Sequence, residues 1–391
     1  MTQAAQSPRI KNPGLDLLLL CVRRQLGADT VERILAIASG ELDGNALFGA
    51  ASEHTLTSLV CKNLLDCAAA ALPTAWRERF SRSYFECSCR NLALTAELFR
   101  VLAALESCGV SATPYKGPVL AAQAYGDVAL REFSDLDIIV RQTQIVAAHR
   151  ALLDLGFSAE ISEIEPSPSP RRVPGQYVFR KGAGTLVELH SERTLRYFPV
   201  PLDLDALCAR RRPITLAGRQ VLTFSPEDTL LLLSVHGSKH LWDRLSWIAD
   251  IAALTARSRL DWALLLDRAR SWRVERMQLL GVGLAVRLFE AAPPTEVIDC
   301  LERDKVSRRM IEQISGRFFS PQKIQPGVFS RFAFRVRMRG DLTQGLPYAI
   351  RLALMPTEVD RGQRRLPEPL YALLRPLRLA RTYGWRTRVG P

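Results

Sequence analysis

The stretch YKGPVLAAQAYGDVALREFSDLDIIV, residues 115–140, places Asp135 and Asp137 one residue apart in an otherwise apolar run. Side chains alternate between the two faces of a strand, so we expect both carboxylates on one face and Leu136 and Ile138 on the other. Neighbouring carboxylates repel each other and resist burial, and a divalent cation relieves both problems. Mg²⁺ is typically bound by one or two carboxylates together with substrate phosphates. We interpret the pair as ligands of Mg²⁺ (or Mn²⁺); the alternative is a strand edge with two solvated acids.

A Lys-Gly-Pro turn lies just upstream of this strand. The run VSATPY is strand-like, Lys116 and Gly117 form a turn, and the following PVLAAQAY predicts a helix. Pro118 suits the first helical position and Gly126 the position just past the end. A helix start offers free backbone N–H groups to phosphate, and Lys116 and Arg131 add positive charge nearby. A phosphate-binding turn and a metal-binding pair are therefore expected close together.

A third carboxylate follows about fifty residues later, in TLVELHSE. Alternation puts Glu188 and His190 on one face of this predicted strand and Val187 and Leu189 on the other. Glu188 is a candidate to complete the metal site or to act as general base on an attacking hydroxyl. Taken without its neighbours, it is also compatible with the surface of an edge strand.

A long helix is predicted from Ser225, because SPED combines a cap residue, an early proline and two acids. We expect it to continue to about residue 257, with a bend near Gly237. One face carries a polar stripe that either binds nucleotide phosphates or forms ordinary surface ion pairs. In the first interpretation Lys239 and a histidine contact phosphate, with Trp242 or Trp247 nearby. The stripe consists of His236, Lys239, His240, Asp243, Trp247 and Asp250.

The whole chain has the composition of a soluble globular protein, with 47% hydrophobic and 24% charged residues. Its apolar runs are far shorter than the roughly 20 residues that a membrane span needs, and no transmembrane segment is expected. The N-terminus lacks a secretory pattern, which favours a cytoplasmic location. The eight cysteines are scattered and are predicted to be reduced.

Four regions are expected along the chain. Residues 1–108 form an N-terminal helical region, 109–222 a region of short strands that carries the acids, 223–310 a second helical region, and 311–391 a basic helical or irregular region. Residues 161–175, rich in Pro and Ser, predict a mobile loop. Residues 311–391 hold fifteen Lys and Arg against five Asp and Glu, which fits either polyanion contact or a solvated surface.

Together these motifs resemble the uncharacterised nucleotidyltransferase family of bacteria, within the DNA polymerase β-like nucleotidyltransferase superfamily. The resemblance runs from about residue 90 to the C-terminus, including the ending LPEPLYALLRPLRLARTYG. The superfamily signature is a Gly-Gly or Gly-Ser turn, then Asp-x-Asp on a strand, then a third acid. Asp135, Asp137 and Glu188 match the acids. Lys116 and Gly117 replace the turn that supplies a phosphate-binding serine.

The resemblance implies an α+β fold, with a small mixed β-sheet palm core between helical regions. It makes residues 109–222 a nucleotidyltransferase palm domain and residues 223–310 a helical domain that completes the nucleotide site. It implies a metal-dependent enzyme that moves a nucleoside monophosphate from an NTP to a hydroxyl and releases pyrophosphate. The acceptor is unidentified, and association of relatives with biosynthetic gene clusters suggests a small molecule, glycan or peptide. Asp135, Asp137 and Glu188 would be the catalytic and metal-binding residues. The expected nucleotide contacts are Lys116, Gly117, Arg131, His236, Lys239 and His240.

Two other functions stay open. The chain fits a non-catalytic relative that binds a nucleotide, or nucleic acid through its basic C-terminal region. It also fits a zinc hydrolase that uses His190, His236 and His240, because HGSKH has the spacing of two zinc ligands on a helix. Bound zinc would favour the hydrolase, whereas activity restored by Mg²⁺ or Mn²⁺ would favour transfer.

Overall fold

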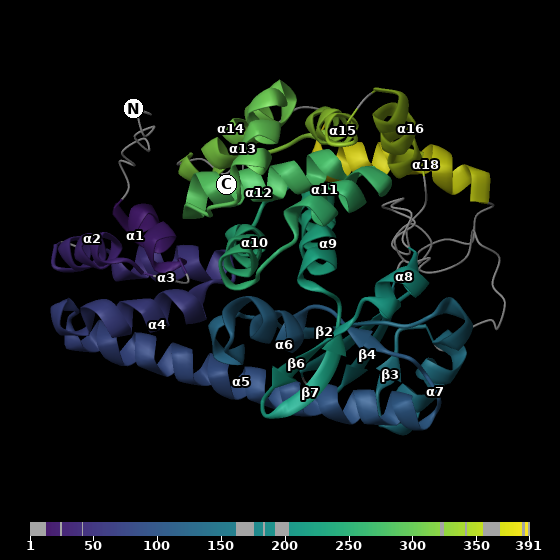
Figure 1. Cartoon of the computed structure of the whole chain (residues 1–391), viewed down its shortest axis with the longest axis horizontal. Coiled ribbons are helices and arrows are strands. Elements are labelled where there is room, and N and C mark those ends of the chain that lie inside the picture. Colours follow the sequence, from purple (N-terminus) through teal and green to yellow (C-terminus); the bar gives the residue numbers. More distant parts are fainter. Residues whose placement is uncertain are drawn as a thin grey trace.

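The computed structural model describes residues 13–23, 26–40, 42–161, 176–182, 184–191, 203–320, 324–340, 342–354, 368–384 and 388–389. Figure 1 shows a small sheet with a long helix beneath it, further helices at the N-terminal side, and a layer of helices above. The α+β fold class predicted from the sequence is confirmed. Except for its first residue, the predicted loop at 161–175 lies outside the described residues.

Helices form the N-terminal region, as the apolar spacing between residues 14 and 110 predicts. Their apolar faces meet in one core that includes Leu17, Leu20 and Leu64. The last helix is the longest, and Gly109 follows its end with a φ of 69°, as expected for a helix terminus. The elements are α1 (Pro13–Cys21), α2 (Ala28–Ala38), α3 (Gly44–Glu53), α4 (Thr57–Ala68), η1 (Ala69–Ala71) and α5 (Thr74–Ser107).

The sheet has five strands in the order β1-β2-β5-β4-β3. Strand β2 is antiparallel to β1 and parallel to β5, and β4 is antiparallel to both β5 and β3, so the sheet is mixed. The two central strands are those predicted to carry the acids. The strands are β1 (Thr113–Pro114), β2 (Asp135–Ile139), β3 (Ser158–Ala159), β4 (Tyr177–Lys181) and β5 (Thr185–His190).

The two faces of the sheet differ in character. Leu136 and Ile138 of β2, with Val187 and Leu189 of β5, join a buried core that also includes α5 and α7 (Ile145–Asp154). Because side chains alternate, the other face carries the acids, and it is turned toward α9 (Figure 1). Burial of one face therefore fixes which way the acidic side chains point.

Short elements connect the strands. The helix predicted after the Lys-Gly-Pro turn is present as α6 (Gly117–Leu120), which continues into the π-helical η2 (Ala121–Tyr125). Gly126 ends it with a φ of 80°, as predicted. The remaining elements of this region are η3 (Val128–Leu130), η4 (Gln142–Gln144), α8 (Leu204–Ala209) and the hairpin β6 (Arg212–Leu216) and β7 (Arg219–Thr223).

The helix predicted from Ser225 begins where expected, since the Ser225 side chain accepts a hydrogen bond from the Asp228 N–H at 3.2 Å. Its predicted continuation to residue 257 is wrong. Helix α9 (Pro226–Lys239) ends, and α10 (Leu245–Arg257) begins after a turn in which Leu241 and Trp242 have positive φ. The indole of Trp242 is fully buried against Gly237, where any Cβ would lie 2.3 Å from the ring. This packing folds the chain back and separates the two helices.

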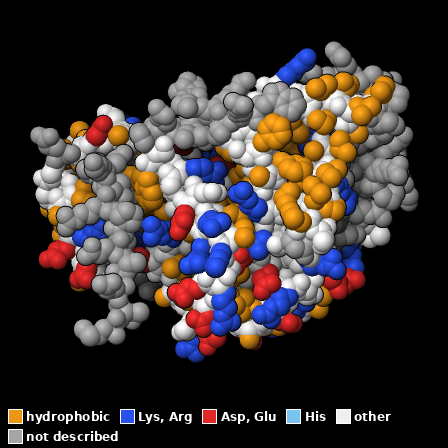
Figure 2. All heavy atoms as spheres, turned by 90° about the horizontal axis from the view of Figure 1, so that it is seen from above, with side chains coloured by type: hydrophobic (Ala, Val, Ile, Leu, Met, Phe, Trp, Pro, Cys, Tyr) orange, Lys and Arg blue, Asp and Glu red, His pale blue; other side chains and the backbone are white. Residues whose placement is uncertain are grey.

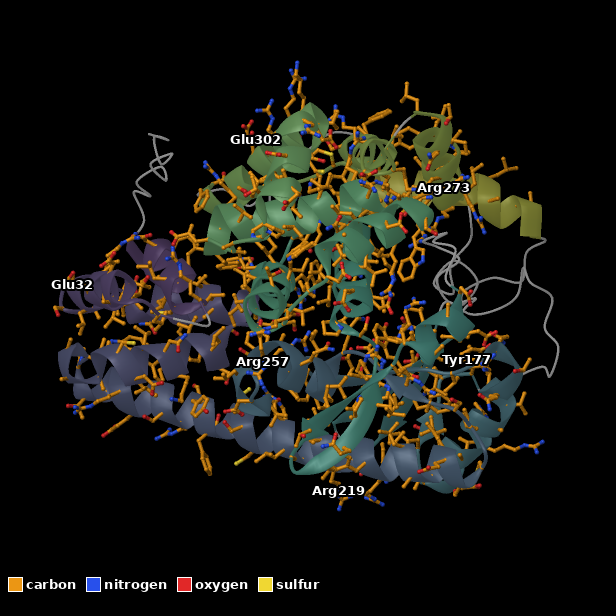
Figure 3. The ribbon with its side chains drawn as sticks, in the orientation of Figure 1. Glu32, Tyr177, Arg219, Arg257, Arg273 and Glu302 are labelled. Atoms are coloured by element: carbon orange, nitrogen blue, oxygen red, sulfur yellow. The ribbon has the colours of Figure 1, made fainter. Side chains whose placement is uncertain are left out.

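The upper layer rests on α9 and α10. Helix α10 packs against η2, and Arg257 at its end, labelled in Figure 3, lies against Gly126 of the lower layer. This contact joins the helical layer to the turn that leads into β2. The further helices of the layer are α11 (Trp262–Ser271), α12 (Glu275–Phe289), α13 (Thr295–Arg303) and α14 (Lys305–Phe319).

The helices of the C-terminal region lie beside α11 at the upper right of Figure 1. It consists of β8 (Ile324–Gln325), α15 (Val328–Arg337), α16 (Leu342–Leu354), α18 (Glu368–Tyr383) and β9 (Arg388–Val389). In the part of the chain that the structure describes, every helix is too short or too polar to cross a membrane. The division into four regions at residues 108, 222 and 310 stays a prediction.

Candidate active site

The parallel pairing of β2 with β5 brings the acidic residues together. Asp137 lies opposite Glu188 in the register, and Asp135 lies opposite Leu186. Paired residues of adjacent strands project from the same face, so Asp135, Asp137 and Glu188 share one side of the sheet, as predicted. Far apart in the chain, these carboxyl groups are positioned by one row of backbone hydrogen bonds.

A potential metal site is formed by Asp137, Glu188 and His190. Their ligand atoms all lie within 4.8 Å of one another, so among the described residues this group could hold one metal ion. This group shares Asp137 and Glu188 with the predicted set and adds His190, and the predicted set of Asp135, Asp137 and Glu188 stays a prediction. Asp135 stands beside it, near enough for its charge to raise the pKa of Glu188.

Asp137 is the most deeply buried of these groups, with a side chain only 4% exposed. Its Oδ1 accepts a hydrogen bond from the Lys116 Nζ at 3.1 Å. The same oxygen lies 3.0 Å from the His190 Nε2, which donates to it because the carboxylate is ionised. The Glu188 carboxylate lies 3.6 Å from the same ring nitrogen and also accepts a hydrogen bond from Gln176.

The electrostatic environment separates these groups by pKa. Burial opposes ionisation of Asp137, but Lys116 and then His190 outweigh it and hold the pKa of this carboxyl well below its usual range. Burial, and then the charges of Asp137 and Asp135, raise the pKa of Glu188 to about 7. Burial lowers the pKa of His190 despite its bond to Asp137. At neutral pH the site combines an ionised carboxylate, a neutral imidazole and a second carboxyl near its midpoint.

The Lys-Gly turn places its ammonium group directly at the acids. Lys116 precedes α6 and is largely buried between Asp137 and the ring of Tyr115, with its Nζ 4.9 Å from the ring centroid. Gly117 has a φ of 52°, and an added Cβ would lie 3.0 Å from the Asp135 carbonyl oxygen. Glycine is therefore required by both its conformation and its close approach to β2.

A cavity of about 600 Å³ opens beside the acids. Lys116, Asp135 and Asp137 line one side, and His236, His240 and Trp247 line another. The three rings lie with centroids 4.8–5.3 Å apart. An aromatic wall therefore faces a charged wall across one space, and this arrangement suits a ligand with both a planar ring and an anionic group.

The histidines of this wall are neutral at physiological pH. Burial, then the charges of Lys239 and Lys116, lower the pKa of His240 to about 3. Burial and Lys116 lower the pKa of His236 well below its usual range. Neither imidazole adds positive charge for a triphosphate, and the predicted contact of a histidine with phosphate stays a prediction.

Arg131 and Lys239, the other predicted nucleotide contacts, differ in their surroundings. Arg131 lines it but is held by Asp250 through two hydrogen bonds, Nε to Oδ1 at 2.9 Å and Nη2 to Oδ2 at 3.0 Å. Lys239, at the end of α9, has an exposed side chain. It lies near enough to Glu188 for its charge to oppose part of the rise in the pKa of Glu188. Trp242, proposed as a neighbour of the nucleotide, is buried in the core instead.

The three histidines of the zinc alternative are not gathered into one site. Among the described residues, His190 groups with Asp137 and Glu188, whereas His236 and His240 group with Trp247. Alternation placed His190 on the acidic face, but the sequence contains nothing that reports its hydrogen bond to Asp137. Asp243, a member of the predicted polar stripe, also lines the cavity, and so do Arg90 and Arg244, which had no distinguishing sequence pattern.

Three comparisons place these observations among known proteins. A family described as "Uncharacterised nucleotidyltransferase" matches the chain over residues 40–290. Comparison with curated proteins gives no match. Among solved structures, the chain is similar to an antigenic nucleotidyltransferase-like protein from Paracoccidioides brasiliensis, with 18% sequence identity over 53% of this chain and 95% of that chain and a TM-score of 0.31. A likeness at this level supports no assignment of residues.

Proposed function

The chain belongs to the family of uncharacterised nucleotidyltransferases, and from this premise we propose that it transfers a nucleoside monophosphate from an NTP to a hydroxyl-bearing acceptor. Pyrophosphate is the second product, and Mg²⁺ or Mn²⁺ is the proposed cofactor. The acceptor that we propose is a small molecule, glycan or peptide. The family establishes only the broad transferase class, so the roles below are our assignments.

One observation carries the proposal: the Asp137, Glu188 and His190 ligand atoms lie within 4.8 Å of one another, and Asp137 lines a cavity together with Asp135 and Lys116. The donor set fits a divalent cation. Three carboxyl groups share one sheet face. Burial and then the charges of Asp137 and Asp135 raise the pKa of Glu188, and a bound cation would offset both. Carboxylate oxygens suit Mg²⁺, and the imidazole is compatible with Mn²⁺.

Asp137 and Glu188 would hold the cation, with Asp135 beside them and His190 orienting Asp137 through its Nε2–H. Such a cation neutralises the phosphate charge that develops during transfer. Lys116 would turn from Asp137 to the NTP phosphates when these enter the cavity. The aromatic wall of His236, His240 and Trp247 would stack on the nucleobase.

The acceptor hydroxyl oxygen forms a bond to the α-phosphorus, and the bond from that phosphorus to the oxygen bridging the α- and β-phosphates breaks. Pyrophosphate leaves with the electron pair. Glu188 is the proposed acceptor of the hydroxyl proton, since a carboxylate whose pKa is about 7 is well matched to that task at neutral pH. Because Glu188 is assigned both to the cation and to the hydroxyl proton, its substitution should weaken metal binding as well as transfer.

The test is transfer of label from each α-³²P-labelled NTP, with Mg²⁺, to a component of a cell extract by the purified protein. Asp137→Asn and Glu188→Gln should each reduce transfer by about 10²–10⁴-fold. Glu188→Gln should leave NTP affinity within about threefold, because it keeps the shape of the side chain and the phosphate contacts. Glu160→Gln, an exposed acid paired with Arg180, is the matched control.

Label transfer that survives both substitutions would contradict the proposal. NTP binding without any transfer would instead identify a nucleotide-binding relative. Loss of NTP affinity in Glu188→Gln equal to the loss of transfer would show that the assigned role of this residue is wrong.

A further inference from the structure

The C-terminal helices expose an unusual number of large apolar side chains. Nine of the fifteen exposed large hydrophobic side chains of the described chain belong to α15, α16 and α18. On α16 they recur every fourth residue, and on α18 at spacings of three and four, so each set forms a stripe along one side of its helix. We call these two stripes the leucine face: Leu342, Leu346, Ile350 and Leu354 of α16, and Leu370, Leu373, Leu374 and Leu377 of α18.

These helices turn their most apolar side outward. Tyr348 and Ala349 of α16 and Ala380 of α18 are buried, whereas members of the leucine face are 41–73% exposed. Helices α16 and α18 pack against each other, so the stripes form one surface. Figure 2 shows a continuous hydrophobic field on this side of the molecule, bordered by Lys and Arg side chains. Contiguous apolar surface of this kind marks a docking site.

The charge around the leucine face is positive. Arg351 follows Ile350 on α16 and Arg381 lies one turn beyond Leu377 on α18, and both are exposed. Residues 311–391 carry ten more Lys and Arg than Asp and Glu. A leucine stripe beside arginines is the pattern of a helix that lies in the membrane interface.

We propose that the leucine face docks on the surface of a bilayer that contains anionic lipid. Its residues favour this occupant over a protein partner, because seven of the eight are leucine, a type that is under-represented among the strong contacts of protein interfaces. A second copy of the chain is disfavoured by charge, since each copy carries a net charge of +13 and would bring a basic surface against another.

Docking leaves the candidate active site accessible. Helices α16 and α18 lie at the upper right of Figure 1, beside α11, and none of their described residues lines the cavity of the candidate active site. The inference therefore does not rest on the proposed transfer reaction, and each can fail without the other.

The test is sedimentation of the full-length protein with vesicles of phosphatidylcholine and with vesicles of equal parts phosphatidylcholine and phosphatidylglycerol. Binding to the anionic vesicles should be at least about tenfold tighter and should weaken as salt rises. The pair L373S/L377S should reduce that binding at least about tenfold. The matched control L92S/L222S changes leucines that are 51% and 49% exposed elsewhere and should bind like the unaltered protein.

A second variant, R351Q/R381Q, removes charge without changing the leucines. It should weaken binding to anionic vesicles severalfold, and thermal melting should show that all variants are folded. Absence of binding to anionic vesicles, or unchanged binding by L373S/L377S, would overturn the proposal. A lipid-free dimer that L373S/L377S converts to a monomer would also overturn it and assign the leucine face to a second copy.

Discussion

The Nζ of Lys116 lies 3.1 Å from the Oδ1 of Asp137, so the residue proposed to bind phosphate is paired with the carboxylate proposed to bind metal. Burial opposes the charge of Lys116, but Asp137 outweighs it and raises the pKa of the ammonium group. The pair is therefore a buried ion pair that metal and nucleotide must together rearrange. Lys116 neutralises the site until a cation and phosphates replace its contact.

Replacement of Lys116 by Met should separate the two kinds of binding. Affinity for Mn²⁺ should rise by about tenfold, because the cation no longer competes with an ammonium group, while NTP affinity should fall by about tenfold. Isothermal titration with MnCl₂, and separately with a non-hydrolysable NTP analogue, measures both. Lys62→Met, at a helix-surface pair with Asp66, is the control. A fall in Mn²⁺ affinity would refute competition between the two cations.

Metal affinity should depend on pH through Glu188. The pKa of Glu188 is raised to about 7, so protons compete with the cation below that value. Apparent Mn²⁺ affinity should increase toward pH 7 by up to about tenfold per pH unit and level off above it. Burial and Asp137 also raise the pKa of Asp135, which acts in the same direction. The measurement is titration calorimetry with MnCl₂ from about pH 5.5 to about pH 8, a range that brackets the titration of Glu188.

The raised pKa of Glu188 also makes the stability of the metal-free fold depend on pH. This stability should fall as pH rises, whereas metal affinity should increase. The folded protein holds the Glu188 proton more tightly than the unfolded chain, so this stabilisation is complete below the unfolded pKa of 4.5 and is lost as pH rises through about 7. Urea unfolding across this range should show a smaller fall in Glu188→Gln than in the unaltered protein. Equal slopes would argue that the carboxyl titrates normally.

The Arg131–Asp250 pair should contribute mainly to stability. Asp250 is 1% exposed and also accepts a hydrogen bond from the Tyr125 hydroxyl at 3.0 Å. Asp250→Asn leaves a buried guanidinium without its counter-charge and should lower the free energy of unfolding by about 3–5 kcal/mol in urea titration. Glu160→Gln, which breaks an exposed pair, should change it by less than about 1 kcal/mol.

Gly117→Ala tests the close approach of the turn to β2. With a φ of 52° and a Cβ only 3.0 Å from the Asp135 carbonyl oxygen, alanine should cost about 1–3 kcal/mol and weaken Mn²⁺ binding by displacing the strand. Gly316→Ala is the control, because that helical position has open space around it and should gain up to about 1 kcal/mol. Similar effects of the two changes on stability would exclude strain at Gly117.

The faces of β2 and β5 could be predicted because alternation is a local property of any strand. Leu136 and Val187 are buried and Asp137 and Glu188 share the opposite face, as the pattern indicates. The helix starting at Ser225 was equally predictable, since a cap bonds to residues three positions away. Local rules therefore supplied the elements, the acidic face and the turn beside it.

The rest depended on contacts between distant segments. The partner of Arg131 lies 119 residues away at Asp250, so the sequence pattern could not show that this carboxylate holds the guanidinium. The break after α9 requires positive φ at Leu241 and Trp242, which neither residue type favours, and is maintained by burial of the Trp242 indole. Polar periodicity could not anticipate a break stabilised by tertiary packing.

The register that sets Asp137 opposite Glu188 makes the spacing within β5 more critical than the length of the chain that leads to it. One extra residue between Thr185 and Glu188 would send the Glu188 carboxyl to the apolar side and a core residue into the cavity. Extra residues in the segment between α7 and β4 would leave the alignment intact. Proteins that share this chemistry should therefore differ freely in overall length while keeping the count from Thr185 to His190 constant.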